Sequence, residues 1–233
     1  EDNDTMRMGY LVPVQKDSGE GYAFVVLDLK GNFLERHSLD LTLEEALSVD
    51  DRKKALMHVL KPSTEVRFAD TMIIACMGEE RTAYLLPGEF PGFKTFIKAM
   101  VALDTDFQIL GLEVIEHEED PGLGGEITQD YFKNQFVGKS FEKLKELTVI
   151  KEPLPADYEL YLETMGTEES GLSAREVAEI QKRYQDKDIY ALTGATISSA
   201  AVTQGVVGMA KKFAYRIRIL DQAVHTGDVP VLF

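Results

Sequence analysis

The strongest periodic pattern in the chain lies near its C-terminal end, over residues 197–220. Apolar residues recur there at spacings of three and four: Val202, Val206, Met209, Phe213, Ile217 and Leu220. Such spacings place the apolar side chains on one face of a helix, and basic residues near the end of the stretch stabilise the negative end of its dipole. The pattern therefore predicts one long amphipathic helix.

Upstream, short apolar runs alternate with turn residues, which is typical of β-strands. We expect strands over residues 22–27, 33–34, 66–77, 82–86, 96–103 and 108–118. Breaks between the middle strands are expected at 78–80 and at the Pro-Gly pairs of 87–88 and 91–92. In the last strand, alternation predicts three apolar residues on one face: Leu110, Leu112 and Val114.

Helices are expected at four further places. Thr42 and Ser173 each begin a capping box, in which the hydroxyl residue and the Glu three positions later bond each other's backbone N–H groups. We expect helices after both, and also over 51–60 and 128–136, whereas 149–172 should be irregular. Strands followed by helices, without βαβ alternation, predict an α+β fold with antiparallel sheets flanked by helices.

Composition and charge narrow the possible partners. The chain has 233 residues, of which 44 % are hydrophobic and 28 % charged, as in an ordinary globular protein. Its formal net charge of −15 argues against nucleic acid and against strongly acidic carriers such as ferredoxins. Partners with a basic or neutral face are favoured.

Candidates for metal, disulfide or nucleophilic chemistry are few. The single cysteine, Cys76, lies in an apolar run and is expected to be a small buried hydrophobe. The histidines share no ligand spacing, and the acidic cluster at 116–120 is typical of a solvated face. We therefore expect neither a metal site nor a catalytic side chain. No apolar run approaches the ~20 residues that span a bilayer.

Small and hydroxyl-bearing residues dominate the start of the long helix: Thr193, Gly194, Ala195, Thr196, Ile197, Ser198 and Ser199. A helix start presents unpaired backbone N–H groups and the positive end of the helix dipole, so it suits an anion, above all a phosphate. In this chain those donors are expected to be the N–H groups of residues 197–199. Taken alone, the run does not exclude an ordinary helix cap with two serines in the first turn.

A second motif follows the strand expected over 108–118 and consists of Glu119, Asp120, Pro121, Gly122, Leu123 and Gly124. Its glycines allow the backbone to approach a flat ligand closely, and Leu123 offers an apolar contact. On its own, this loop is also typical of an ordinary glycine-rich turn.

Together the two motifs resemble those of the FMN-binding domain family, which includes the G subunit of the Rnf complex and the C subunit of the sodium-translocating NADH:quinone oxidoreductase. The first resembles the family's Ser/Thr-Gly-Ala-Thr-x-Ser/Thr motif. The second resembles its Glu-Thr-Pro-Gly-Leu-Gly loop, with Asp120 in place of Thr. The resemblance implies FMN joined through its phosphate to Thr196, with the flavin ring against the 121–125 loop and the 193–195 turn.

The resemblance also implies a domain organisation and one departure from the family pattern. It covers mainly residues 50–222, which we expect to form the FMN-binding domain, with 1–49 as an N-terminal extension of unassigned role and 223–233 as a C-terminal tail. The family usually carries Asp six residues before the acceptor Thr. This chain has Tyr190 there, with Asp186 and Asp188 nearby as possible substitutes.

By resemblance, the expected function is that of an electron-transfer subunit with one covalent FMN in a membrane ion-translocating complex of the Rnf type. Other redox subunits would be its partners, and a flavin transferase would attach the cofactor. The domain would face the extracytoplasmic, periplasmic side, held by an N-terminal anchor or directed by a signal that this chain lacks. Two alternatives stay open: a stand-alone flavinylated carrier of another respiratory or extracellular reductase system, and a flavin-free structural or sensory relative.

Overall fold

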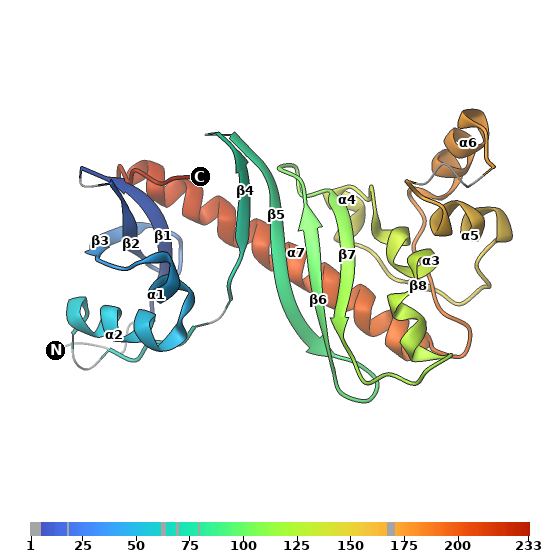
Figure 1. Cartoon of the computed structure of the whole chain (residues 1–233), viewed down its shortest axis with the longest axis horizontal. Helices are drawn as coiled ribbons and strands as arrows, with labels where there is room; N and C mark the ends of the chain where they lie inside the picture. The colour runs from blue at the N-terminus through green and yellow to red at the C-terminus, as the bar shows by residue number, and fades with distance from the viewer. Residues whose placement is uncertain (1–5, 18, 62–63, 69, 79, 167–170) are drawn as a thin grey trace. The chain divides into compact units, whose positions relative to one another are not determined.

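A computed structural model describes residues 6–17, 19–61, 64–68, 70–78, 80–166 and 171–233 (Figure 1). The chain divides into two compact units. One comprises Glu1–Asp70, Gly78–Glu80 and Ala214–Phe233, and the other Thr71–Met77 and Arg81–Phe213.

The first unit contains a three-stranded antiparallel sheet in the order β1-β2-β3. Its elements are β1 (Met8–Lys16), β2 (Gly19–Leu27), β3 (Phe33–Leu39), α1 (Leu43–Leu47) and α2 (Val49–Val59). The capping box expected at Thr42 is present, with the Thr42 side chain accepting from the Glu45 N–H. Strand β1 was not expected from the sequence. It contains Pro13, which a strand tolerates at the edge of a sheet.

The second unit contains a four-stranded antiparallel sheet in the order β4-β5-β6-β7 and a set of short helices. The strands are β4 (Ile73–Met77), β5 (Glu80–Pro91), β6 (Phe96–Leu103) and β7 (Ile109–Glu116). After them come η1 (Gly124–Thr128), α3 (Asp130–Lys133), η2 (Asn134–Phe136), α4 (Phe141–Leu144), β8 (Val149–Ile150), α5 (Ala156–Glu163), α6 (Ala174–Tyr184) and β9 (Ile189–Tyr190). The parallel pair β8 and β9 forms a separate small sheet.

The long helix α7 (Thr196–Thr226) begins at the small-residue motif, and its part up to Phe213 crosses one face of the β4–β7 sheet (Figure 1). Two glycines allow the close approach. A Cβ atom on Gly205 would lie 2.4 Å from the Phe90 ring, and one on Gly88 would lie 2.3 Å from Met209 Sδ. The expected α+β fold, with antiparallel sheets, flanking helices and this helix, is confirmed. None of the helices in the described ranges is both long and apolar enough to cross a bilayer.

Several local expectations were wrong. The strand expected over 66–77 spans only Ile73–Met77, and β5 continues through the Pro87-Gly88 pair to Pro91. Pro87 pairs with Met100 of β6, so the strand accommodates a residue without an N–H. The stretch 149–172, expected to be irregular, contains β8 and α5. Cys76, on the edge strand β4, is exposed rather than buried.

The expected apolar face of β7 is broken by a β-bulge. Ala102 pairs with Gly111 and Leu103 with Ile109, so Leu110 is an extra residue with no partner in the register. Leu112 and Val114 are buried as expected, whereas Leu110 is exposed. A bulge shifts the alternation of side chains by one position, which the apolar pattern alone does not reveal.

Candidate functional site

The chain enters α7 through a turn that the helix itself stabilises. Gly194 has φ +77°, a conformation that favours glycine, and the Ala195 N–H donates to the Leu192 carbonyl at 3.0 Å. The Ser199 hydroxyl accepts from the Leu192 N–H at 2.9 Å and donates to the Ala195 carbonyl at 3.0 Å. Ser199 therefore holds the approaching segment against the first turn of the helix.

The hydroxyl groups of the first motif fall into two sets. Ser198, Ser199 and Thr203 are buried, and the Thr203 hydroxyl donates to the Ser199 carbonyl at 2.8 Å. Thr193 is exposed and Thr196 is half-buried. Of the five hydroxyls, only those of Thr193 and Thr196 thus lie on residues that reach solvent.

One expectation about the helix start needs correction. The N–H groups of residues 197–199 were expected to be the donors for an anion, but the Ser199 N–H already donates to the Ala195 carbonyl at 3.0 Å. The described chain offers no backbone acceptor to the N–H groups of Thr196, Ile197 and Ser198. The set of open donors therefore begins one residue earlier.

The second motif forms a compact loop between β7 and η1. The N–H groups of Leu123 and Gly125 both donate to the Asp120 carbonyl, at 3.1 and 2.8 Å. Gly122 has φ +70°, and apart from its two chain neighbours no heavy atom of the described residues lies within 4 Å of the position where its Cβ would be. The loop therefore presents bare backbone at Gly122 and a half-exposed apolar side chain at Leu123.

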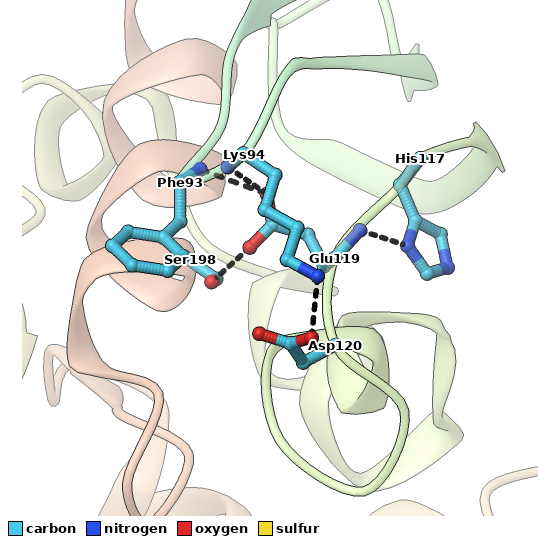
Figure 2. A network of polar contacts seen from close by, with 6 residues as sticks. All are labelled: Phe93, Lys94, His117, Glu119, Asp120 and Ser198. Atoms are coloured by element: carbon cyan, nitrogen blue, oxygen red, sulfur yellow. Dashed lines mark hydrogen bonds and ion pairs between the residues drawn. The ribbon is translucent and has the colours of Figure 1, made fainter.

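The structure brings the two motifs into direct contact. The Ser198 hydroxyl donates to the Glu119 carboxylate, and both side chains are buried (Figure 2). A Cβ atom on Gly124 would lie 2.6 Å from Ser198 Oγ, and one on Gly194 would lie 3.1 Å from Leu123 Cδ2. Every predicted site residue lies on one of these two touching segments.

A third segment, which the sequence did not reveal, joins them at the 92–95 turn between β5 and β6. The backbone N–H groups of Phe93 and Lys94 donate to Glu119 Oε1 at 2.8 and 3.1 Å (Figure 2). The Lys94 ammonium pairs with Asp120 at 2.5 Å, and this hydrogen bond raises the pKa of Lys94. The one signal of this turn in the sequence is the glycine at position 92. The structure explains it, because a Cβ atom on Gly92 would lie 2.5 Å from Glu119 Oε1.

The acidic cluster at 116–120 is therefore not simply a solvated face. Glu116 and Glu118 are exposed, but only 4 % of Glu119 is. Its position is fixed locally as well, because the Glu119 N–H donates to Nδ1 of His117 at 3.1 Å. Glu119 is a buried acceptor for three donors from two other segments.

Buried side chains fix the position of Tyr190, which lies in the segment that leads into the 193–199 motif. The Gln135 amide accepts from the Tyr190 N–H at 2.8 Å and donates to the Tyr190 carbonyl at 3.3 Å. The Tyr190 ring lies in a cluster with Tyr158 and Tyr184, which stack with their centroids 4.4 Å apart. The residue that departs from the family pattern is thus part of an aromatic core.

Asp188, one of the carboxylates near Tyr190, is already bonded. It pairs with Lys143 at 2.7 Å and accepts from the Thr148 hydroxyl at 2.6 Å. Burial alone would raise the pKa of Asp188, but these hydrogen bonds outweigh it and lower the pKa. The carboxylate therefore joins the residue before β9 to α4 and to the residue before β8.

The sequence profile of the FMN-binding domain matches residues 92–211, a range that contains both motifs and the 92–95 turn. The chain belongs to the FMN-binding domain family. Three relatives that match parts of this chain are named as subunits of ion-translocating oxidoreductases.

The G subunit of the proton-translocating ferredoxin:NAD(+) oxidoreductase complex of Clostridium ljungdahlii is 28 % identical, over 67 % of this chain and 67 % of its own length. The C subunit of the Na(+)-translocating NADH-quinone reductase of Yersinia pestis is 28 % identical, over 49 % and 45 %. The G subunit of the Na(+)-translocating ferredoxin:NAD(+) oxidoreductase complex of Acetobacterium woodii is 29 % identical, over 51 % and 42 %. The chain thus spans two thirds of the first relative and less than half of the other two.

Two solved structures also match the chain, both with TM-scores below 0.5. NqrC of Shewanella oneidensis is 15 % identical with a TM-score of 0.39, over 84 % of this chain and 62 % of that one. The C subunit of the Na(+)-translocating NADH-quinone reductase of Parabacteroides distasonis is 18 % identical with a TM-score of 0.42, over 84 % and 74 %.

Proposed function

We propose that this chain carries one FMN in phosphoester linkage to Thr196 and transfers electrons as a subunit of a membrane ion-translocating complex of the Rnf type. Family membership supports the cofactor, and the names of the relatives support the complex. The observation that carries the proposal is the contact between the two motifs at the start of α7, where Thr196 is half-buried and its neighbouring serines are fully buried.

The residues at the helix start fit a phosphate. The N–H groups of Thr196, Ile197 and Ser198 are open, and the 31-residue helix places the positive end of its dipole there. A phosphate ester on the Thr196 side chain would lie beside these donors. Thr193 fits less well, because Gly194 separates it from the helix.

The residues around the helix start also fit a flat ring. Gly194 and Ala195 carry little or no side chain, and Leu123 touches the position of a Gly194 Cβ. FMN supplies one- and two-electron transfer, and the chain's own groups hold and orient it. Backbone N–H groups and apolar side chains suit that task, since they add dipoles and burial without a titrating group.

The partners follow from the same proposal. Other subunits of a membrane redox complex, on its extracytoplasmic side, would donate and accept the electrons. The net charge of −15 favours subunits with a basic or neutral face. A flavin transferase would attach the cofactor, and the half-exposed Thr196 is accessible to such an enzyme whereas Ser198 and Ser199 are not.

The decisive experiment is to export the protein in a host with a matched flavin transferase and to measure the intact mass. One FMN less one water should be added, on the peptide that contains Thr196. Thr196→Val should abolish the addition. Thr203→Val, a matched change in the same helix, and Ser199→Ala should keep it. Flavin on the Thr196→Val protein, or on another residue, would overturn the assignment, and an unmodified wild-type protein would favour the flavin-free alternative.

A further inference from the structure

Three large apolar side chains are exposed around the proposed site, and each comes from a different segment. The exposed fraction is 56 % for Phe93 in the 92–95 turn, 45 % for Leu123 in the second motif, and 60 % for Ile197 in the first turn of α7. Single exposed apolar residues are common on protein surfaces. These three differ because the segments that carry them meet at one buried carboxylate.

That carboxylate, Glu119, has its oxygens directed at the protein. Oε1 accepts from the N–H groups of Phe93 and Lys94, and Oε2 accepts from the Ser198 hydroxyl (Figure 2). Gly92 is what permits this arrangement, since a Cβ atom there would lie 2.5 Å from Oε1. Glu119 therefore holds the 92–95 turn against the start of α7 and is not turned toward a ligand.

We propose that the 92–95 turn is a third wall of the flavin site, in which Phe93 contacts the isoalloxazine ring and Glu119 is the positioning residue. This inference rests on the proposed function, because it requires a flavin tethered at the start of α7. The Phe93 N–H and the Ser198 hydroxyl both donate to the Glu119 carboxylate, so the 92–95 turn adjoins the first turn of that helix (Figure 2). An aromatic side chain there adds a second apolar contact to that of Leu123, and aromatic rings favour offset or edge contacts with flat ring systems.

A tether at the phosphate fixes only one end of the cofactor. The ring at the other end stays free to move unless the protein contacts it on more than one side. The second motif contains no aromatic residue of its own. Its buried Glu119 supplies one indirectly, because the carboxylate holds Phe93 of the β5–β6 hairpin, 26 positions away in the chain, next to the motif.

The first test uses the flavin-free protein and the hydrogen exchange of single backbone amides. Glu119→Ala should speed exchange at Phe93 and Lys94 by about tenfold, because both amides lose their acceptor. Glu119→Gln should leave it nearly unchanged, since the Gln carbonyl accepts from both amides and its NH₂ donates to Ser198 Oγ. Exchange that does not respond to Glu119→Ala, or that Glu119→Gln does not rescue, would overturn the positioning role.

The second test uses the flavinylated protein and the time-resolved fluorescence anisotropy of the flavin. In the wild type the anisotropy should decay only with overall tumbling, whereas Phe93→Ala should add a fast nanosecond component. Phe96→Ala is the matched control, because Phe96 lies on the same hairpin and is equally exposed at 56 %. It should behave as the wild type.

The outcomes separate this inference from the proposed function. A flavin that stays attached and equally immobile in Phe93→Ala contradicts the third wall and leaves the function intact. The same holds if Phe96→Ala loosens the ring as much as Phe93→Ala does. A wild-type protein that takes up no flavin contradicts both.

Discussion

The Ser198 hydroxyl donates a hydrogen bond to the Glu119 carboxylate across 79 positions of the chain. Ser198 belongs to the small-residue motif and Glu119 to the glycine-rich loop, so this one bond connects the two motifs found in the sequence. Both residues are buried, and a buried polar group without its partner is costly. The geometry of the site therefore depends on the tertiary fold of the second unit.

A double-mutant cycle measures this connection. Ser198→Ala and Glu119→Ala should each lower the free energy of unfolding, and the pair should couple by about 1–3 kcal/mol, because either single change already removes the bond. Urea unfolding of the four proteins gives the value. Glu118→Gln serves as a control, since Glu118 is exposed and its substitution should change little. Additive losses would contradict the connection.

Two glycines of the second motif should respond differently to valine. A Cβ atom on Gly124 would lie 2.6 Å from Ser198 Oγ and 2.7 Å from Glu119 Oε2, so Gly124→Val should cost about 1–3 kcal/mol of stability or more. Gly122 has open space around it, and Gly122→Val should cost only the backbone strain of φ +70°, about 1–2 kcal/mol. Thermal unfolding compares them, and a larger loss for Gly122→Val would argue against the loop as described.

Only Gly122→Val should act mainly on the cofactor. In the flavinylated protein, a side chain at this open position lies where the ring is proposed, so the visible spectrum and midpoint potential should change while the protein stays folded. An unaltered spectrum and potential would remove Gly122 from the site.

The sequence predicted what is encoded locally. The capping boxes at Thr42 and Ser173 are present, and so is the long helix, because a periodic apolar face and a cap are short-range properties. The bulge at Leu110 and the helix over Ala156–Glu163 were missed. A bulge depends on pairing with another strand, and α5 lies in a stretch whose prolines indicated loop. The division into 1–49, 50–222 and 223–233 stays a prediction.

The site was predicted in the same uneven way. Both motifs were found from the sequence. The hydrogen bonds from the Phe93 and Lys94 N–H groups to Glu119 were missed, because a contact between a backbone N–H and a distant carboxylate leaves no periodic signal. Glu119 was singled out by the resemblance alone. The acidic pattern does not distinguish it from Glu116 and Glu118, which are exposed. Which carboxylate of an acidic run is buried depends on the fold.

Gln135 should be essential for the shape of the segment before the motif. It is buried, and its amide bonds both the N–H and the carbonyl of Tyr190. Gln135→Leu would leave both backbone groups unpaired, at a cost of about 2–4 kcal/mol in the free energy of unfolding. Gln204→Leu on the exposed side of α7 is the control and should change stability by less than about 0.5 kcal/mol. Equal effects of the two changes in urea unfolding would contradict this role.

Introducing the family's usual residue at position 190 should destabilise this chain. Tyr190 lies edge-on to Tyr158 and Tyr184, with ring centroids 6.3 and 6.4 Å away. Tyr190→Asp would bury a carboxylate among these rings and should cost about 3 kcal/mol or more, whereas Tyr190→Phe keeps the ring and should cost less than about 1 kcal/mol. Urea unfolding compares the two variants. A tolerated Asp would mean that the aromatic cluster does not decide the identity of this position.

Lys139 should make the stability of the protein rise at alkaline pH. Its ammonium is buried and donates to the carbonyls of Gln185 and Lys187, at 3.0 and 2.7 Å. Burial, aided by the charge of Lys143, lowers the pKa of Lys139 from 10.5 to about 8, against the opposing charges of Asp188 and Asp186. Between these two values the unfolded chain binds more protons than the folded one, so the free energy of unfolding should increase with pH, by no more than about 3 kcal/mol. Urea unfolding of the wild type and of Lys139→Met from pH 7 to 10.5 tests this. The difference between their free energies of unfolding should rise with pH, because the contributions of the other titrating groups are the same in both proteins and cancel. A constant difference between the two proteins across that range would show that the Lys139 proton is not linked to folding.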